Sequence, residues 1–538
     1  MRATNMNNAM SKTKLFLAPV AVLVLTATAY AAAPGITGPA FSLTAQDAYI
    51  SQPDGASVYS WGYGCNGNPA GYAPSAIGGA FCNPMQVPGP TLIVTQGQTV
   101  TVTLTNNLPS SAGNTSILFP GFQMQAFASG NGVPGLLTQE AAHGGTVTYT
   151  FTASSPGTRA YYSGTQGDLQ IEMGLYGAII VLPSSVPGVC TTQPIRTNLY
   201  GVPDYISTSG GIPERDFRLA DAAYSHAKAC YDREYLFQFA EMDPNIHNQA
   251  QAQVLATKGC VAGALGCSLN VPTEPYHPAY FLINGRSMPD DMDANYAPMY
   301  PHQPYNGDPH MHPGEQVLLR VIGQGRWQHP FHEHANHVRI LARDGNLILS
   351  QTDPTSLAGP LLFTTTTTPG LAMDGIFYYT GRGLNWDMYA HKPTSTDPNA
   401  TLPCAPDANG YNTGTAAQTA INYFEWCQDH NKPLQVAPFG DVASGGPATL
   451  PDPNILTNGA WYGGSPYLGP NATVRATGPT GVTPPSGTIA NTPAAEAGFA
   501  FMWHSHNERE ITTNNAFPGG MLMMMLVDSR EFVIDETN

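Results

Sequence analysis

A period-two alternation of apolar and polar residues is the sequence feature that most constrains the fold. In PTLIVTQGQTVTVTLTNNL, which begins at Pro90, the apolar residues Val100, Val102 and Leu104 alternate with threonines after a Gln-Gly turn signal. Successive side chains of a strand point to opposite faces, so the stretch predicts a pair of half-buried strands. The later stretch GTVTYTFTASSPGTRAYYSG repeats the pattern.

Turn-forming residues extend this prediction to the whole chain. The 538 residues include 56 glycines and 48 prolines, and only 11% are charged. Such a composition is typical of many short strands joined by turns, so we expect an all-β protein of two or three domains. The net charge of -16 argues against nucleic-acid binding, which needs clustered Lys and Arg to neutralise phosphates.

The patterns divide the chain into segments. We expect one β-sandwich over residues 32–187, a connecting segment over 188–229, and a second sandwich over 230–538. Periodicity fades into Pro, Gly, Asn and Thr between about 380 and 492. We interpret that stretch as a loop-rich insertion in the second sandwich, because histidine-bearing strands lie on both sides of it, with a small third domain as the alternative.

The first 31 residues predict a secretory signal peptide. Three basic residues precede an apolar run from Leu15 to about Thr28, followed by the small-residue site Ala29-Tyr30-Ala31. This run is shorter than the roughly 20 apolar residues that span a bilayer. We therefore expect a protein without a membrane span, secreted, periplasmic or at the cell surface.

Eight cysteines in an exported chain predict disulfides. Eight cysteines allow 105 pairings, and the sequence does not select one. Nearest-neighbour pairing would close four local loops: Cys65 with Cys82, Cys190 with Cys230, Cys260 with Cys267, and Cys404 with Cys427.

Histidine spacing suggests a metal site. In a strand, residues i and i+2 share a face, so His332 with His334, and His504 with His506, can each aim two imidazoles to one side. A nitrogen-rich site with few carboxylates favours copper or zinc. For a single H-x-H pair, a solvated strand edge is the alternative. The stretch DPHMHPG we interpret as an exposed turn, with an accessory copper site as the alternative.

The order of several motifs resembles the multicopper oxidases, which are built from cupredoxin domains. The motifs are PTLIVTQGQTVTVTLTNNL, GVPGLLTQ, PGTRAYYSG, GLYGAIIV, PGEQVLLRVIG, HPFHEH and WHSH…GGM. The resemblance implies tandem Greek-key β-sandwiches and copper as the metal. In the family's H-P-x-H-x-H motif the three histidines bind type 1, type 2 and type 3 copper, which assigns His329, His332 and His334 here.

The family's last motif, His-Cys-His, gives His504 and His506 as type 3 ligands, but two type 1 ligands are replaced, by Ser505 and Glu510. A blue copper centre needs the thiolate that Ser505 lacks. The first sandwich departs further: Leu-Phe-Pro-Gly at 118–121 and Tyr-Ser-Gly at 162–164 stand where the family has histidines. Only four of the family's eight trinuclear-cluster histidines remain, so ordinary laccase activity is not expected.

We therefore expect one reduced copper site, of one or two ions, formed by the two H-x-H pairs, with zinc as an alternative metal. Glu508 and Glu510 are candidate catalytic carboxylates, and His329 is a further candidate ligand or a relic. Three functions stay open: a copper oxidoreductase acting on a small molecule or metal ion, a copper-sequestering protein, and an extracellular structural or matrix protein. A homo-oligomer is also left open.

Overall fold

The computed structural model describes residues 32–129, 132–191, 216–312, 315–379, 404–408, 410–412, 426–427, 464–468, 497–528 and 534. The predicted signal peptide, most of the predicted insertion and part of the connecting segment lie outside these residues. Within the described residues, no helix is both long and apolar enough to cross a membrane.

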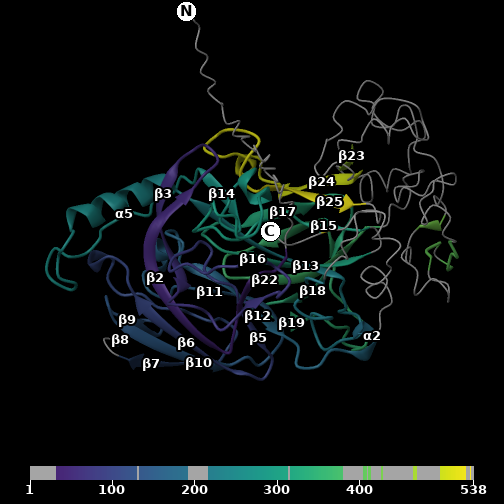
Figure 1. Ribbon diagram of the computed structural model, residues 1–538, viewed down its shortest axis with the longest axis horizontal. Coiled ribbons are helices and arrows are strands. Elements are labelled where there is room, and N and C mark those ends of the chain that lie inside the picture. Colours follow the sequence, from purple (N-terminus) through teal and green to yellow (C-terminus); the bar gives the residue numbers. More distant parts are fainter. Residues whose placement is uncertain are drawn as a thin grey trace, which may run out of the picture.

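Two five-stranded sheets form the first sandwich (Figure 1). Its strands are β1 (Gly35–Thr37), β2 (Ala40–Ser51), β3 (Ser57–Cys65), β4 (Tyr72–Ala73), β5 (Leu92–Thr95), β6 (Thr99–Asn106), β7 (Gln125–Ser129), β10 (Thr146–Thr152), β11 (Gly157–Tyr162) and β12 (Tyr176–Leu182). One sheet has the order β11-β12-β5-β1-β4, and the other has the order β3-β2-β6-β10-β7. A separate hairpin pairs β8 (Gly132–Pro134) with β9 (Gln139–Ala141).

The alternation in β6 predicts its burial correctly but not its partner. Val100, Val102 and Leu104 are fully buried, and Val102 faces Tyr149 of β10 across the antiparallel ladder. The expected pairing of β5 with β6 is wrong, because the two strands lie in opposite sheets. The continuous apolar run of β5 explains this position, since β5 lies between two parallel neighbours, β1 and β12.

The second sandwich carries the histidine strands. Its strands are β13 (Arg233–Met242), β14 (Tyr280–Ile283), β15 (His310–Met311), β16 (Gln316–Gly323), β17 (His329–Glu333), β18 (Val338–Arg343), β19 (Asn346–Leu347), β20 (Leu361–Leu362), β21 (Thr364–Thr367), β22 (Ala372–Tyr378), β23 (Gly464–Leu468), β24 (Ala497–Ser505) and β25 (Leu522–Asp528). One sheet has the order β14-β13-β16-β22-β18-β19, with β20 also on β18. The other has the order β15-β25-β24-β17-β21, with β23 also on β24.

Helices in the described residues are few and short: η1 (Ser110–Ala112), α1 (Gly167–Gln170), α2 (Gly188–Thr191), α5 (Pro244–Ala256), η2 (Asp290–Met292) and η6 (Glu508–Ile511). The longest, α5, is capped by Asp243, whose side chain accepts a hydrogen bond from the Asn245 backbone amide, and begins with Pro244. The expected all-β class with tandem cupredoxin-like sandwiches is confirmed.

A buried polar group joins the two sandwiches. Asp374 of β22 accepts hydrogen bonds from the amide and hydroxyl of Thr158 in β11, at 3.1 and 2.6 Å, and from the hydroxyl of Tyr224. Arg320 of β16 lies 3.6 Å from the same carboxylate. Because all of these groups are buried, the junction depends on their mutual pairing.

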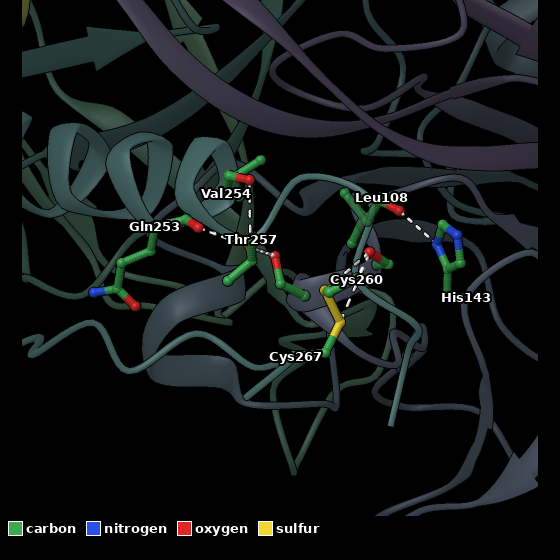
Figure 2. The surroundings of a disulfide bond; sticks show 9 residues. Leu108, His143, Gln253, Val254, Thr257, Cys260 and Cys267 are labelled. Atoms are coloured by element: carbon green, nitrogen blue, oxygen red, sulfur yellow. Dashed lines mark hydrogen bonds between the residues drawn. A yellow bond between two sulfur atoms is a disulfide. The ribbon is translucent and has the colours of Figure 1, made fainter. Parts of the chain in front are cut away.

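Each of the four disulfides joins a cysteine to its nearest neighbour in sequence and closes a local loop. Figure 2 shows Cys260–Cys267 beside the end of α5, where Thr257 hydrogen-bonds back to the Gln253 carbonyl. His143, the single histidine of residues 32–187, lies in the same view with its Nδ1 2.8 Å from the Leu108 carbonyl oxygen.

The interpretation of DPHMHPG as an exposed turn is wrong. His310 and His312 are fully buried, and His310 begins β15, which pairs in parallel with the carboxyl-terminal part of β25. The short strand is held from the other sheet as well, since the Tyr235 hydroxyl donates to the His310 carbonyl at 2.5 Å.

Candidate metal centre

Two adjacent antiparallel strands bring the H-x-H pairs together. His332 of β17 lies directly opposite His504 of β24 in the ladder. Because side chains two residues apart share a face, His334 and His506 are placed on the same side of these strands. One nitrogen from each of His332, His334 and His504 lies within 4.8 Å of the other two. The spacing therefore fits three donors to one ion.

The four imidazoles differ in exposure. His332, His334 and His504 are at most 9% exposed, whereas the His506 side chain is 52% exposed. The Nε2 atoms of His334 and His504 are 3.1 Å apart, and the His506 ring centroid is 4.7 Å from that of His332. The cluster thus has three buried members and a fourth at its solvent edge.

Hydrogen bonds orient two of these rings. The His504 Nδ1 lies 2.7 Å from the Ser505 carbonyl oxygen, which can only accept, so Nδ1 carries the proton and Nε2 keeps its lone pair. The His332 Nδ1 lies 2.6 Å from the Thr364 hydroxyl of β21. Such contacts fix ring orientation and tautomer in metal sites.

The rings of His332 and His504 are held neutral. Burial, together with the neighbouring imidazoles His334, His504 and His506, lowers the pKa of His332 to about 3. Burial also lowers the pKa of His504. Neutral imidazole is the form that binds a metal, so few protons compete with the ion at neutral pH.

His329 faces the opposite side of β17. Its side chain is fully buried, with Nε2 2.9 Å from the Glu241 carboxylate of β13 and Nδ1 2.8 Å from the Glu510 carboxylate of η6. Burial by itself lowers the pKa of His329, but the two carboxylates outweigh it and raise the pKa to about 9. Both nitrogens are engaged, so the structure does not bring His329 into the four-histidine cluster.

The two candidate glutamates are placed differently. Glu510 is buried and accepts hydrogen bonds from the Ser505 hydroxyl at 2.5 Å and from the side-chain amide of Asn507 at 2.8 Å. It lies with His329, on the core side of the strands. Glu508 is exposed, with one oxygen 3.9 Å from the Nδ1 of His506. Of the two carboxylates, Glu508 is therefore the one beside the cluster.

In the first sandwich, packing occupies the positions where the resemblance implies ligands. Leu118 forms a backbone bridge with Tyr162. The Phe119 ring packs on Phe151 and Tyr161, with centroids 4.8 and 5.7 Å away. Among the described residues, the group formed by His332, His334 and His504 is the single set of three or more His, Cys, Asp or Glu side chains with metal-ligand spacing.

Sequence reasoning missed two residues around the cluster. Glu241 lies in the strand sequence REYLFQFAEM, in which Arg233, Glu234 and Gln238 are also polar and buried, so its charge does not single it out. Thr364 lies in a run of threonines in which nothing marks one member from another.

Comparison with known proteins agrees with the motifs. Residues 80–186 match a family model described as a multicopper oxidase. The multicopper oxidase MCE of Talaromyces pinophilus is 36% identical over 98 residues, 18% of this chain and 15% of that protein. The iron transport multicopper oxidase FET3 of Saccharomyces cerevisiae is 38% identical over 103 residues, 19% of this chain and 16% of that protein. Each match thus covers under a fifth of the relative.

Among solved structures, a multicopper oxidase named mgLAC aligns with 92% of this chain and 88% of its own, at 14% identity and a TM-score of 0.42. A blue copper oxidase from Nitrosomonas europaea aligns with 90% of this chain and 85% of its own, at 14% identity and a TM-score of 0.43.

Over residues 80–186 the chain is similar to the multicopper oxidases. Copper is the metal that this likeness implies. The matched residues 80–186 contain none of the four clustered histidines, which all lie in the second sandwich.

Proposed function

We propose that this protein is an exported copper protein with one reduced site, formed by His332, His334, His504 and His506, and that it acts as a copper oxidoreductase. The observation that carries the proposal is the convergence of three buried imidazoles on two paired strands, with donor atoms within 4.8 Å. Neutral nitrogen donors without a thiolate suit copper, and the multicopper oxidase likeness favours copper over zinc.

A blue copper centre is not part of the proposal. All eight cysteines are paired in disulfides, so no thiolate is at hand in the second sandwich. Copper bound by imidazoles supplies one-electron chemistry. The imidazoles of His332, His334 and His504 would bind the copper ion and fix its position. The half-exposed His506 leaves one edge of the site open to a small molecule or metal ion.

Glu508 is proposed as the proton-holding group at that edge. Its carboxylate lies 3.9 Å from the His506 Nδ1 and is exposed to water, so it can exchange protons with solvent. Glu510 does not take this role, because its oxygens accept from Ser505 and Asn507 and contact His329.

The second candidate function is copper sequestration without turnover. The burial of three of the four histidines favours it, since limited access suits retention of an ion. Both functions need the same ligands, so they are separated by turnover and not by binding.

Metal analysis and electron paramagnetic resonance of the copper-loaded protein test the site. We expect one copper per chain with a type 2 signal, lost in His332→Ala and in His504→Ala. His277→Ala is the matched control, because this exposed histidine lies outside the cluster. Copper retained in both cluster variants would refute the site. A folded wild-type protein that binds no copper would support a structural function.

Turnover is measured on the same copper-loaded sample. Reduction of the bound ion by a small reductant, followed by reoxidation in air, would support the oxidoreductase. A bound ion that does not cycle would support sequestration.

A further inference from the structure

We infer that Glu241, His329 and Glu510 form a buried bridge that positions the metal-binding histidines from the opposite face of their strands. This inference rests on the proposed function of the cluster as a metal site. The bridge joins both sheets of the second sandwich, since Glu241 belongs to β13 of one sheet and His329 to β17 of the other.

The bridge lies at the end of the sandwich core. Along β13, the buried Phe237 and Phe239 share the face that Glu241 continues, and in β17 the buried Phe331 shares the face of His329. The Phe239 and Phe331 rings touch across the core, with centroids 4.7 Å apart. The polar contact between the Glu241 carboxylate and the His329 imidazole therefore lies next to the apolar packing and extends the contact between the two sheets.

One end of the bridge fixes the entry to β17. The second oxygen of Glu241 accepts hydrogen bonds from the backbone amides of Arg326 and Trp327, at 2.7 and 2.8 Å. These residues lie just before β17, separated by Gln328 from His329, whose imidazole contacts the other oxygen of the same carboxylate. A single buried side chain thus holds both the loop and the first residue of the strand.

The other end fixes the exit from β24. Glu510 accepts hydrogen bonds from the Ser505 hydroxyl and from the Asn507 side chain. The backbone amide of Asn507 in turn donates to the Ser505 hydroxyl oxygen, at 3.2 Å. His504 and His506 flank Ser505, so their backbone positions follow from contacts made behind the cluster. Ligands held in this way are pre-organised for the ion.

The bridge occupies the place where the resemblance puts type 1 copper. His329, Ser505 and Glu510 correspond to three of its ligand positions, and here Glu510 contacts the other two directly, at 2.8 and 2.5 Å. A network of hydrogen bonds and opposite charges thus links strands that a metal ion links in the family. The position that binds type 1 copper in the family is here a hydrogen-bonded support.

The test compares Glu510→Gln and His329→Gln with Glu333→Gln. Glu333 is the matched control, because it is a buried carboxylate on the same face of β17 that accepts from Thr365, outside the bridge. We expect the two bridge variants to bind copper about 10- to 100-fold more weakly, with altered copper hyperfine splitting. The control should keep wild-type affinity and spectrum.

Amide hydrogen exchange of the metal-free protein supplies a readout that needs no copper. Loss of the bridge should speed exchange at residues 329–334 and 503–507 more than elsewhere in the second sandwich. If wild type binds no copper, the proposed function fails, but faster local exchange would still support the bridge. Folded bridge variants with unchanged exchange and unchanged copper affinity would overturn the inference. If His329→Gln does not fold, Glu241→Gln replaces it in both measurements.

Discussion

The stability of the metal-free protein should fall as pH rises through the titration of His329. Its pKa is raised from 6.5 to about 9 by Glu241 and Glu510. A base with a raised pKa stabilises the fold fully below its unfolded pKa and loses that contribution as pH passes its folded pKa. The difference between 6.5 and about 9 corresponds to about 3 kcal/mol of unfolding free energy, at about 1.4 kcal/mol per pH unit.

Glu172 titrates in part of the same window. Burial raises its pKa to about 8, so the fold holds a proton that the unfolded chain has released, and stability falls with pH up to about 8 from this group as well. The Tyr276 hydroxyl donates to Glu172 at 2.7 Å and to Glu241 at 3.3 Å, which links the two carboxylates. The His329 contribution must therefore be measured as a difference between variants.

Denaturant unfolding at pH 6, 7, 8 and 9, with disulfides intact, measures that difference. Wild type should lose about 3 kcal/mol more than His329→Gln across this range. At pH 6 the variant should be the less stable of the two, because it leaves two buried carboxylates without their cationic partner. Parallel pH profiles for the two proteins would refute the assignment of a charged imidazole to the bridge.

Three further outcomes are expected. Ser505→Cys combined with Glu510→His should give a copper-loaded protein with a visible thiolate-to-copper band, which wild type lacks, because a cysteine and a second histidine then converge with His329. Copper should stay bound at mildly acidic pH, because the low pKa of His332 keeps protons from competing with the ion for this nitrogen. Equilibrium dialysis measures the bound copper. Asp374→Ala should lower the free energy of unfolding by about 3 kcal/mol in denaturant titration, because it leaves the buried guanidinium of Arg320 with one partner fewer. A decrease below about 0.5 kcal/mol would contradict the structural role given to Asp374 at the junction.

Local patterns predicted part of the fold because their physical cause is local. The burial of Val102 follows from alternation alone, whereas the cysteine pairing, one of 105 possibilities, is selected only by the folded chain. The sheet to which β5 belongs does not follow from alternation, because its partners β1 and β12 are distant in sequence. A two-residue link such as Gln96-Gly97 fits a hairpin and a crossing between sheets equally well.

The candidate site was predictable to a similar depth. Period-two spacing places His332 and His334 on one face, but their register against β24 depends on strand pairing across more than 160 residues. The side on which Glu510 lies depends on η6 turning the chain back under Ser505, which no spacing rule reveals. Glu241 is almost 90 residues before its imidazole partner, and β13 contains another glutamate, Glu234, so no local pattern marks the contact.

Because the four imidazoles differ in exposure, the affinity of the proposed site for copper and the rate of copper exchange should depend on different residues. Under the proposed function, the buried nitrogens of His332, His334 and His504 would supply most of the copper-binding free energy, and the half-exposed His506 would lie where the ion enters and leaves. His506→Ala should raise the rate at which a chelator removes copper by a larger factor than it weakens copper affinity.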